Sequence, residues 1–410
     1  MKIVIISTLD TKGVEAAFMR DLILNGGHTP VVVDPGSTGV PAFEGDVTRQ
    51  QVALASGESL EDLLKRDDKA YCQRKMTEGL VQSILRLYSA GEVQGVIAVG
   101  GGQGTAIATT AMQALPIGIP KVMVSTVACG KTTFGPYVGV KDVTMIHSVA
   151  DVSGLNRVTK PIIAQATAAV IAMASVKLED AFTRESIGLT MTGVVTPGAM
   201  VVREELEKQG FEVIVFHGNG IGTKAMEELV LQGRIKGVVD YSPHDVPDAL
   251  YDGLMPAPPE RMRAEGKMGI PYIVVPGCAD IRLHEWREDW PADLKNRPFV
   301  RHTPTHTHFR TTRAEMAAVA EYIAQRLNEG SGPRAALTPL RGFSMMNRAG
   351  KPLFDDNANQ GYTETLRAQL NPVVRREELD LHINDPEFAR HTARVFMELW
   401  QQYQKERSQA

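Results

Sequence analysis

Short runs of apolar, mostly β-branched residues recur along this chain, separated by segments with the apolar spacing of helices. In the first part of the chain the strand-like runs are 2–8, 29–34, 94–99 and 121–126, and the helix-like segments are 14–26, 75–90, 105–115 and 161–178. Strands that are apolar throughout belong to parallel sheets covered by helices on both faces. The alternation therefore predicts an α/β fold built on a mainly parallel sheet.

The same pattern restarts near residue 186. The new strand-like runs are 186–193, 211–218, 236–242 and 272–277, with helix-like segments at 198–209 and 223–232. Three stretches echo earlier ones: 203–217 resembles 20–34, 233–242 resembles 91–100, and 272–281 resembles 121–130. Any two α/β units share such a pattern, but the matched glycines and strand order favour duplication. We expect two related α/β domains, 1–180 and 186–410, joined by a charged segment at 178–186.

Three further segments lie outside this rhythm. Residues 40–72 look like an insertion that carries its own helix at 59–66. Residues 311–328 and 386–404 have the spacing of amphipathic helices, so we interpret them as packing elements.

Charge and composition exclude several classes of partner. The net charge is −4 and aromatic residues make up 6% of the chain, so neither a basic field nor a base-stacking platform recruits nucleic acid or an anionic membrane. The three cysteines are far apart and form no disulfide framework, which fits a reducing cytoplasm. The apolar run near the N-terminus is too short for a signal peptide, and 166–176 is too short to span a bilayer. We expect a cytoplasmic protein.

A glycine-rich loop follows the strand at 94–99. Glycines at a strand-to-helix turn allow the backbone to approach a ligand, and the helix start offers unpaired N–H groups to a phosphate. The spacing Gly100-x-Gly102-x-x-Thr105 lacks the last glycine of the dinucleotide fingerprint, and the next strand ends without an acidic residue. We therefore do not expect NAD. The alternative is that these glycines serve only tight strand–helix packing.

Three more polar loops follow predicted strands. Residues 125–133 imitate a P-loop, but Gly135 and Pro136 prevent an immediate helix and exclude a Walker-type motor. The other two loops are 7–13 and 34–38. Because ligands of open α/β sheets lie beyond the carboxyl ends of the strands, four such loops favour an anionic ligand. Asp10 or Asp34 is then a candidate for holding Mg²⁺ through water, although Asp10 is equally a helix N-cap candidate.

Several motifs in these loops and beyond them are shared with a known family. The stretches STLDTKG (7–13), VGGGQGTA (99–106), VSTVACG (124–130), the long block 137–156 and HINDPEFA (382–389) resemble an uncharacterised ATP-binding family of bacteria and fungi. A plant relative of that family includes the N-terminal region of the tomato tobamovirus resistance protein. The resemblance covers residues 1 to about 405, and the block at 137–156 is its most specific part.

The resemblance implies two Rossmann-like domains and an ATP–Mg²⁺ site in the first. By this resemblance, the nucleotide or its metal would be lined by Thr8, Asp10, Thr11 and Lys12, the phosphates would be held by Gly101, Gly102, Gly104 and Thr105, and the site would be bordered by Thr126 and Gly130. The polar loops themselves add Gly36, Ser37, Lys131 and Thr132 as further candidates. The chain departs from the family pattern at Lys131, and the loops 240–250 and 276–286 replace more acidic or threonine-rich ones. A site in the second domain is therefore expected to differ in ligand or role.

Histidines in the second half suggest a second polar site. His306 and His308 alternate on one predicted strand face, and Asp280 or His284 would complete a 2-His-1-carboxylate metal set. The alternative is a surface loop whose histidines bind phosphate, backbone or water. His284 and His306 are candidate proton-transfer groups because histidine titrates near neutral pH, and His244 and Asp245 are candidates for the same cleft.

Three further polar residues are interpreted as structural rather than functional. Cys129 and Cys278 are interpreted as ordinary thiols rather than nucleophiles, and Asp385 before Pro386 as a helix N-cap.

The leading hypothesis is an ATP- and Mg²⁺-binding enzyme that acts on a small anionic metabolite between the two domains. The alternatives are a nucleotide-sensing module without catalysis, and an ATP-independent lyase, isomerase or hydrolase that uses a metal at the histidines. A homodimer is expected, with no nucleic-acid or membrane partner. The sequence names neither the substrate nor the reaction.

Overall fold

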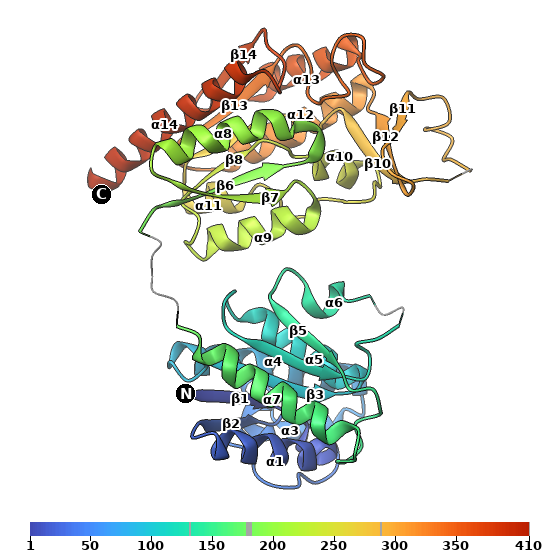
Figure 1. Ribbon diagram of the computed structural model, residues 1–410, viewed down its shortest axis with the longest axis vertical. Helices are drawn as coiled ribbons and strands as arrows, with labels where there is room; N and C mark the ends of the chain where they lie inside the picture. The colour runs from blue at the N-terminus through green and yellow to red at the C-terminus, as the bar shows by residue number, and fades with distance from the viewer. Residues whose placement is uncertain (131–132, 178–182, 288, 410) are drawn as a thin grey trace. The chain divides into compact units, whose positions relative to one another are not determined.

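The computed structural model describes residues 1–130, 133–177, 183–287 and 289–409. The chain divides into two compact units, Met1–Glu179 and Asp180–Ala410 (Figure 1). Each unit is built on a parallel sheet, so the predicted α/β class with two Rossmann-like domains is confirmed. Among the described helices, none combines the length and the apolar character needed to cross a bilayer.

The first unit contains a five-stranded parallel sheet with the order β2-β1-β3-β4-β5. The strands are β1 Lys2–Ile6, β2 Thr29–Val33, β3 Gly95–Gly100, β4 Lys121–Ser125 and β5 Val143–His147. The chain moves outward in one direction from β1 to β2 and then returns to the other side of β1 for β3. In a doubly wound sheet, such a reversal separates the loops at the carboxyl ends of the two central strands.

Helices cover both faces of this sheet. They are α1 Leu9–Asn25, α2 Arg49–Ala55, α3 Leu60–Lys65, α4 Lys69–Ser89, α5 Gly102–Ala114, α6 Gly135–Val138 and α7 Thr159–Ser175. Ile3 and Ile5 pack with α1 and α7 on one face, while Val4 and Ile6 pack with α2 to α5 on the other (Figure 1). Burial on both faces explains why these strands are apolar at every position.

The second unit repeats this strand order and adds one strand. Its main sheet runs β7-β6-β8-β9-β13-β14, and all of its pairs are parallel. The strands are β6 Ser186–Met191, β7 Glu212–His217, β8 Gly237–Asp240, β9 Tyr272–Val274, β13 Arg334–Pro339 and β14 Arg375–Leu379. The first five correspond in order to β1 through β5, which is the topology that the echoed stretches predict.

A small antiparallel sheet, with the order β10-β12-β11, follows β9 in the second unit. Its strands are β10 Ile281–Glu285, β11 Phe299–Arg301 and β12 His306–Arg310. The helical elements of this unit are η1 Gly193–Val195, α8 Thr196–Lys208, α9 Gly220–Leu231, α10 Asp245–Leu250, α11 Ala264–Met268, α12 Arg313–Glu329, α13 Asp356–Gln369 and α14 Pro386–Gln409.

Two helices begin earlier than the apolar spacing predicts. α1 begins at Leu9 rather than at 14, and α5 begins at Gly102 rather than at 105. In both cases the polar loop forms the first helical turn. Such a turn can form without the apolar spacing from which the helix was predicted. The polar residues after β1 and β3 are therefore helix N-termini rather than free loops.

A buried ion cluster joins the segment after β8 to its surroundings. The Arg261 guanidinium donates to Asp240 (2.5 Å), Asp245 (3.0 Å) and Glu227 (3.0 Å), and Arg261 is fully buried. Removing one partner of such a network typically costs about 3–5 kcal/mol, because the remaining charges stay buried. Asp245 is therefore a structural partner of Arg261, and the expectation that it faces a catalytic cleft is wrong.

The same region contains an unpaired buried carboxyl that makes stability depend on pH. Both carboxyl oxygens of Glu265 are buried without a hydrogen-bond partner among the described residues. Burial raises the pKa of Glu265 well above its usual value, and the nearby Glu227 raises it further. A carboxyl with a raised folded-state pKa contributes stability below its unfolded pKa, and this contribution is lost as the pH rises.

We expect Glu265→Gln to remove this pH-dependent loss. The free energy of unfolding of the variant, relative to wild type, should rise by about 1 kcal/mol or more between pH 4.5 and pH 8. Urea unfolding at both pH values measures the difference. The control is Glu260→Gln, because Glu260 is a largely exposed carboxylate nearby. An equal difference at both pH values would contradict an ionisable, destabilising Glu265.

Candidate functional site

A cavity of about 580 Å³ opens at the carboxyl ends of β1, β2 and β3. We call it the N-terminal cavity. The loops after these strands and the α3–α4 segment line it with Thr8, Asp10, Thr11, Lys12, Pro35, Ser37, Thr38, Leu63, Leu64, Asp67, Asp68, Lys69, Cys72, Gln73, Met76, Gly100, Gly101, Gly102, Gln103, Gly104 and Ile107. It lies at the reversal of strand order between β1 and β3, where doubly wound sheets bind their ligands.

The glycine loop leaves room beside its backbone. A Cβ on Gly104 would have no neighbour within 4 Å, and those on Gly101 and Gly102 would meet single side-chain atoms only at 3.7 and 3.8 Å. None of these three glycines has a positive φ. Only Gly100 is crowded, since its Cβ would lie 3.0 Å from the Gly104 Cα. Tight packing therefore explains Gly100, but it does not explain the three glycines that follow.

The start of α5 offers unpaired backbone donors at the same place. Gly101 is the N-cap, and no side chain caps the helix. The first backbone bond into the helix is donated by Thr105 to the Gly101 carbonyl, so the N–H groups of Gly102, Gln103 and Gly104 precede the helical ladder. Three such donors and the positive end of the helix dipole suit an anion that approaches over the glycines.

Two carboxylates organise the loops after β1 and β2. One Asp34 oxygen accepts from the backbone N–H groups of Leu9 (3.1 Å) and Gly36 (2.8 Å). Asp34 is buried, burial raises its pKa, and it does not line the N-terminal cavity. A Cβ on Gly36 would lie 2.8 Å from Asp34, so packing explains this glycine as well. Asp34 and Gly36 are structural, which corrects their expected roles in Mg²⁺ and nucleotide binding.

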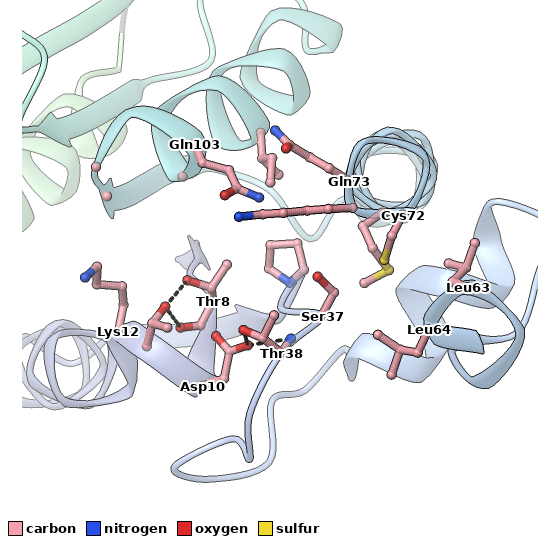
Figure 2. A pocket seen from close by; sticks show the side chains of 18 of the residues that line it. Thr8, Asp10, Lys12, Ser37, Thr38, Leu63, Leu64, Cys72, Gln73 and Gln103 are labelled. Carbon is pink, nitrogen blue, oxygen red and sulfur yellow. Dashed lines mark hydrogen bonds between the residues drawn. The ribbon is translucent and has the colours of Figure 1, made fainter. Parts of the chain in front are cut away.

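Asp10, unlike Asp34, lines the N-terminal cavity. One carboxylate oxygen, Oδ2, accepts from the backbone N–H of Thr38 (2.9 Å) and from its hydroxyl (2.8 Å), and Asp10 lines the cavity. Figure 2 shows Asp10, Thr8 and Lys12 on one side of the cavity. This side therefore gathers one carboxylate, one ammonium and the hydroxyls of Thr8 and Thr11, which lie 2.9 Å apart.

Lys12 links the cavity to the block 137–156. Its ammonium donates to the Val152 carbonyl, and the nearby Glu15 accepts from the backbone N–H of Gly154 (2.7 Å). Lys12 itself departs from helical geometry, with φ −128° and ψ 22°. These contacts fix the loop after β5 against the start of α1.

Several predicted ligand residues do not line the N-terminal cavity. Thr105 is fully buried, and its hydroxyl pairs with that of Ser125 at 2.6 Å, so its expected phosphate contact is wrong. Thr126 and Gly130 follow β4 and are absent from the lining; Gly130 has a φ of +60° that suits glycine. Lys131 and Thr132 lie outside the described residues.

The opposite side of the cavity carries an apolar group of side chains that the sequence did not reveal. Figure 2 shows Leu63 and Leu64 on α3 and Cys72 on α4, and Met76 of α4 also lines the cavity. Asp67, Asp68 and Lys69, where α3 passes into α4, line it too. Residues 40–72 do contain the predicted helix, but they serve as a wall of the site rather than as a separate insertion. The apolar spacing of α3 and α4 shows that each helix buries one face, but it does not reveal which loop that face meets.

A second cavity, of about 240 Å³, lies in the second unit, and we call it the histidine cavity. It is lined by Thr192, Gly193, Val194, His217, His244, Met255, Cys278, Ile281, Leu283, His302, Thr303, His306 and His308. The main sheet contributes residues at the ends of β6, β7, β8 and β9, the small sheet and its β11–β12 turn contribute most of the rest, and Met255 comes from the segment after α10. The histidine cavity therefore lies at the carboxyl ends of the strands that correspond to β1 through β4.

Burial keeps two of these imidazoles neutral. Together with the neighbouring histidines, it lowers the pKa of His244 to about 3 and that of His308 to about 4. Burial also raises the pKa of the Cys278 thiol to about 12, and Cys278 shares a hydrogen bond with Thr192. Cys278 is therefore a protonated thiol at neutral pH, which agrees with its interpretation as an ordinary buried cysteine.

The predicted metal set is not assembled. His306 and His308 line the histidine cavity, but His284 is not among its lining residues. Asp280 is fully buried and accepts from the Ser344 hydroxyl at 2.6 Å. Within the described residues, no group of three or more His, Cys, Asp or Glu side chains has the arrangement of a metal site. The described residues therefore do not form the candidate 2-His-1-carboxylate centre, and of the two candidate proton-transfer groups only His306 lines the histidine cavity.

Comparison with known proteins places both units in one family. The N-terminal domain model of the uncharacterised protein family UPF0261 matches residues 1–179, and its C-terminal domain model matches 184–400. A UPF0261 protein of Clostridium tetani is 39% identical over 390 residues, covering 95% of this chain and 96% of that protein. One of Rhizobium meliloti is 37% identical over 401 residues, covering 97% and 99%.

A plant protein is also similar. The ToMV resistance protein Tm-1(GCR237) of Solanum lycopersicum is 35% identical over 313 residues, which are 74% of this chain and 41% of that protein. The expected resemblance to bacterial proteins and to the tomato resistance protein is confirmed. Among solved structures, MurG of Acinetobacter baumannii covers 97% of this chain and 99% of its own at 10% identity, with a TM-score of 0.22 that establishes no shared fold.

The structural role of Thr105 gives a direct test. Thr105→Val should lower the free energy of unfolding by about 1–2 kcal/mol, because the buried Ser125 hydroxyl loses its side-chain partner and keeps only the hydrogen bond from the Val127 backbone N–H. The control is Thr110→Val, which changes an exposed hydroxyl on the same helix and should alter stability by less than about 0.5 kcal/mol. Chemical denaturation measures both variants. Equal stabilities would show that the Thr105–Ser125 pair does not support the fold.

Proposed function

This chain belongs to the uncharacterised protein family UPF0261, and we propose that its N-terminal unit binds ATP with Mg²⁺ in the N-terminal cavity. We further propose that the protein is an enzyme that acts on a small anionic metabolite. The observation that carries the nucleotide proposal is the glycine loop. Gly101, Gly102 and Gly104 have no steric or backbone need to be glycine, yet they border three unpaired helical N–H groups.

The polar side of the cavity fits a triphosphate and its metal. The N–H groups at the start of α5 would receive phosphate oxygens, and Lys12 and Lys69 add positive charge to the lining. Mg²⁺ in proteins is commonly held by one or two carboxylates together with waters and substrate phosphates. Asp10 lines the cavity and would hold the ion directly or through water. Bound Mg²⁺ would neutralise phosphate charge, as phosphoryl transfer requires.

The apolar side of the cavity fits a base. Leu63, Leu64, Cys72 and Met76 form a wall that an adenine ring would pack against. Gln73 and Gln103 also line the cavity and carry amides that donate and accept hydrogen bonds. An elongated ligand with one anionic end and one flat apolar end matches this distribution.

Gly104→Ala separates the ligand role of the loop from its packing role. The added Cβ has open space in the free protein, and alanine favours helix over glycine by roughly 0.5–1 kcal/mol. Stability should therefore be unchanged or slightly higher, while affinity for ATP–Mg²⁺ falls at least about tenfold by steric exclusion. Isothermal titration calorimetry measures the affinity, with Thr110→Ala as the control on the same helix. Undiminished affinity in a folded Gly104→Ala variant would remove the main support for the proposal.

Asp10→Asn tests the metal. The amide oxygen can still accept from Thr38, but the side chain no longer attracts a cation. We expect the gain in ATP affinity on adding Mg²⁺ to shrink several-fold, while binding in EDTA stays close to wild type. Titrations with Mg²⁺ and with EDTA measure both values. If the Mg²⁺-dependent gain is the same as in wild type, Asp10 does not hold the ion.

Turnover distinguishes an enzyme from a sensor. ADP release from ATP in the presence of small carboxylates and phosphate esters is expected for the enzyme that we propose. Tight nucleotide binding without ADP release for any of them would favour the nucleotide-sensing alternative.

A further inference from the structure

The histidine cavity occupies the same topological place as the N-terminal cavity. The order β7-β6-β8-β9 in the second unit matches β2-β1-β3-β4 in the first. Thr192 follows β6 and His244 follows β8, as Thr8 follows β1 and Gly101 follows β3. Both cavities therefore open at a reversal of strand order, which is where a doubly wound sheet accommodates a ligand.

The lining of the histidine cavity is chemically distinct. It contains five histidines, two threonines, one cysteine and one methionine, but no Asp, Glu, Lys or Arg among the described residues. His302, His306 and His308 come from the small sheet and its turn, so an element without a counterpart in the first unit supplies most of the imidazoles. The cavity is less than half as large as the N-terminal one, about 240 Å³ against about 580 Å³.

Two imidazoles in this cavity lack partners. The Nδ1 atoms of His244 and His308 are buried and have no hydrogen-bond partner among the described residues. Their side chains belong to residues that are 5% and 7% exposed, and their ring centroids lie 6.4 Å apart. A buried polar atom without a partner is costly, and such atoms are rare in folded proteins unless a ligand or water satisfies them.

We propose that the histidine cavity binds a small anion through a carboxylate or phosphate group that His244 and His308 contact. This inference deepens the proposed function, because it gives the small anionic metabolite a binding site in the second unit. Imidazoles can become positive but never negative, and no described carboxylate in the lining would repel an anion. A metal cation is less well served, because the described residues offer no metal-binding group of three or more ligands.

Anion binding should be accompanied by proton uptake. In the free protein His244 and His308 are neutral near pH 7, since burial lowers the pKa of both. An adjacent anion favours the imidazolium form, so binding draws a proton from solvent and tightens as the pH falls. The other titratable groups facing these two rings are His217, His302, His306 and Cys278, none of which carries a negative charge in its protonated or neutral form.

The test uses the full-length protein with inorganic phosphate and malonate as probes, each compared with chloride at equal ionic strength. Calorimetry at pH 6 and pH 8, in two buffers of different ionisation enthalpy, reports affinity and proton uptake. We expect at least one probe to bind, with several-fold higher affinity at pH 6 and a net uptake of protons. The double variant His244→Gln/His308→Gln should weaken binding at least about tenfold.

Three controls locate the bound anion. His284→Gln alters a histidine of the small sheet that does not line the cavity, and it should retain binding. Gly104→Ala should also retain it, which distinguishes this cavity from the phosphate-binding loop of the first unit. His306→Gln, at a half-buried position, should weaken anion binding. This single variant tests the proposal if the double variant does not fold.

Several outcomes would overturn the proposal. They are no binding of either probe up to 50-fold above the concentration of protein, binding that Gly104→Ala abolishes and the histidine variants do not, or uptake of Zn²⁺ that requires His244 and His308 without any response to anions. Failure of the nucleotide proposal would instead show as unchanged ATP affinity in Gly104→Ala, so the two failures are distinguishable.

Discussion

The reversal of strand order beside the first strand of each sheet is the constraint from which both candidate sites derive. In the first unit β1 lies between β2 and β3, so helix α1, which leaves β1, and helix α5, which leaves β3, run to opposite faces of the sheet. The carboxyl ends of β1 and β3 are left uncovered, and helices α1 and α5 begin there. Backbone donors, a carboxylate and a lysine meet at that opening because the topology brings the ends of three strands together.

The second unit has the same opening but different side chains around it. In place of a glycine loop it has His244, and in place of an apolar helical wall it has the small sheet with His306 and His308. The buried Arg261 forms ion pairs with Asp240 and Asp245 and so fixes the segment after β8 in place. One topology thus supports two chemically unlike cavities, since the sheet fixes where a ligand lies while the loops determine which ligand fits.

Much of this organisation was predictable from the sequence, because strand burial leaves a strong apolar signal. Strands β1 to β4 and β6 to β9, the duplicated order and the convergence of the loops after β1 and β3 follow from that signal, whereas β5, β13 and β14 were not predicted. The direction in which an individual side chain points does not follow from the apolar signal. Thr105 and Asp245 look like ligand residues by position, yet their side chains turn inward to Ser125 and Arg261. The cavity wall formed by α3 and α4 was not predicted, because contacts between an insertion and a distant loop leave no local pattern in the sequence.

The edge strand β5 and the strand β11 of the small sheet were missed for a related reason, whereas β12 was predicted from the alternation of His306 and His308. β5 is only half-buried, and β11 is largely exposed, so neither presents the continuous apolar run of a central strand. The grouping of His244 with His308 depends on this small sheet. Sequence spacing pointed to His306 and His308 as neighbours, but their common cavity with His217 required the three-dimensional arrangement.

The contacts of Lys12 and Glu15 limit where a shortened fragment of the first unit can end. Lys12 reaches Val152 and Glu15 reaches Gly154, so residues separated by about 140 positions in the chain close on each other. A fragment that stops before this loop would expose a carboxylate that is normally buried and leave a lysine without its carbonyl acceptor. A fragment that keeps both contacts must therefore extend beyond Gly154, even though every residue lining the N-terminal cavity is found before residue 108.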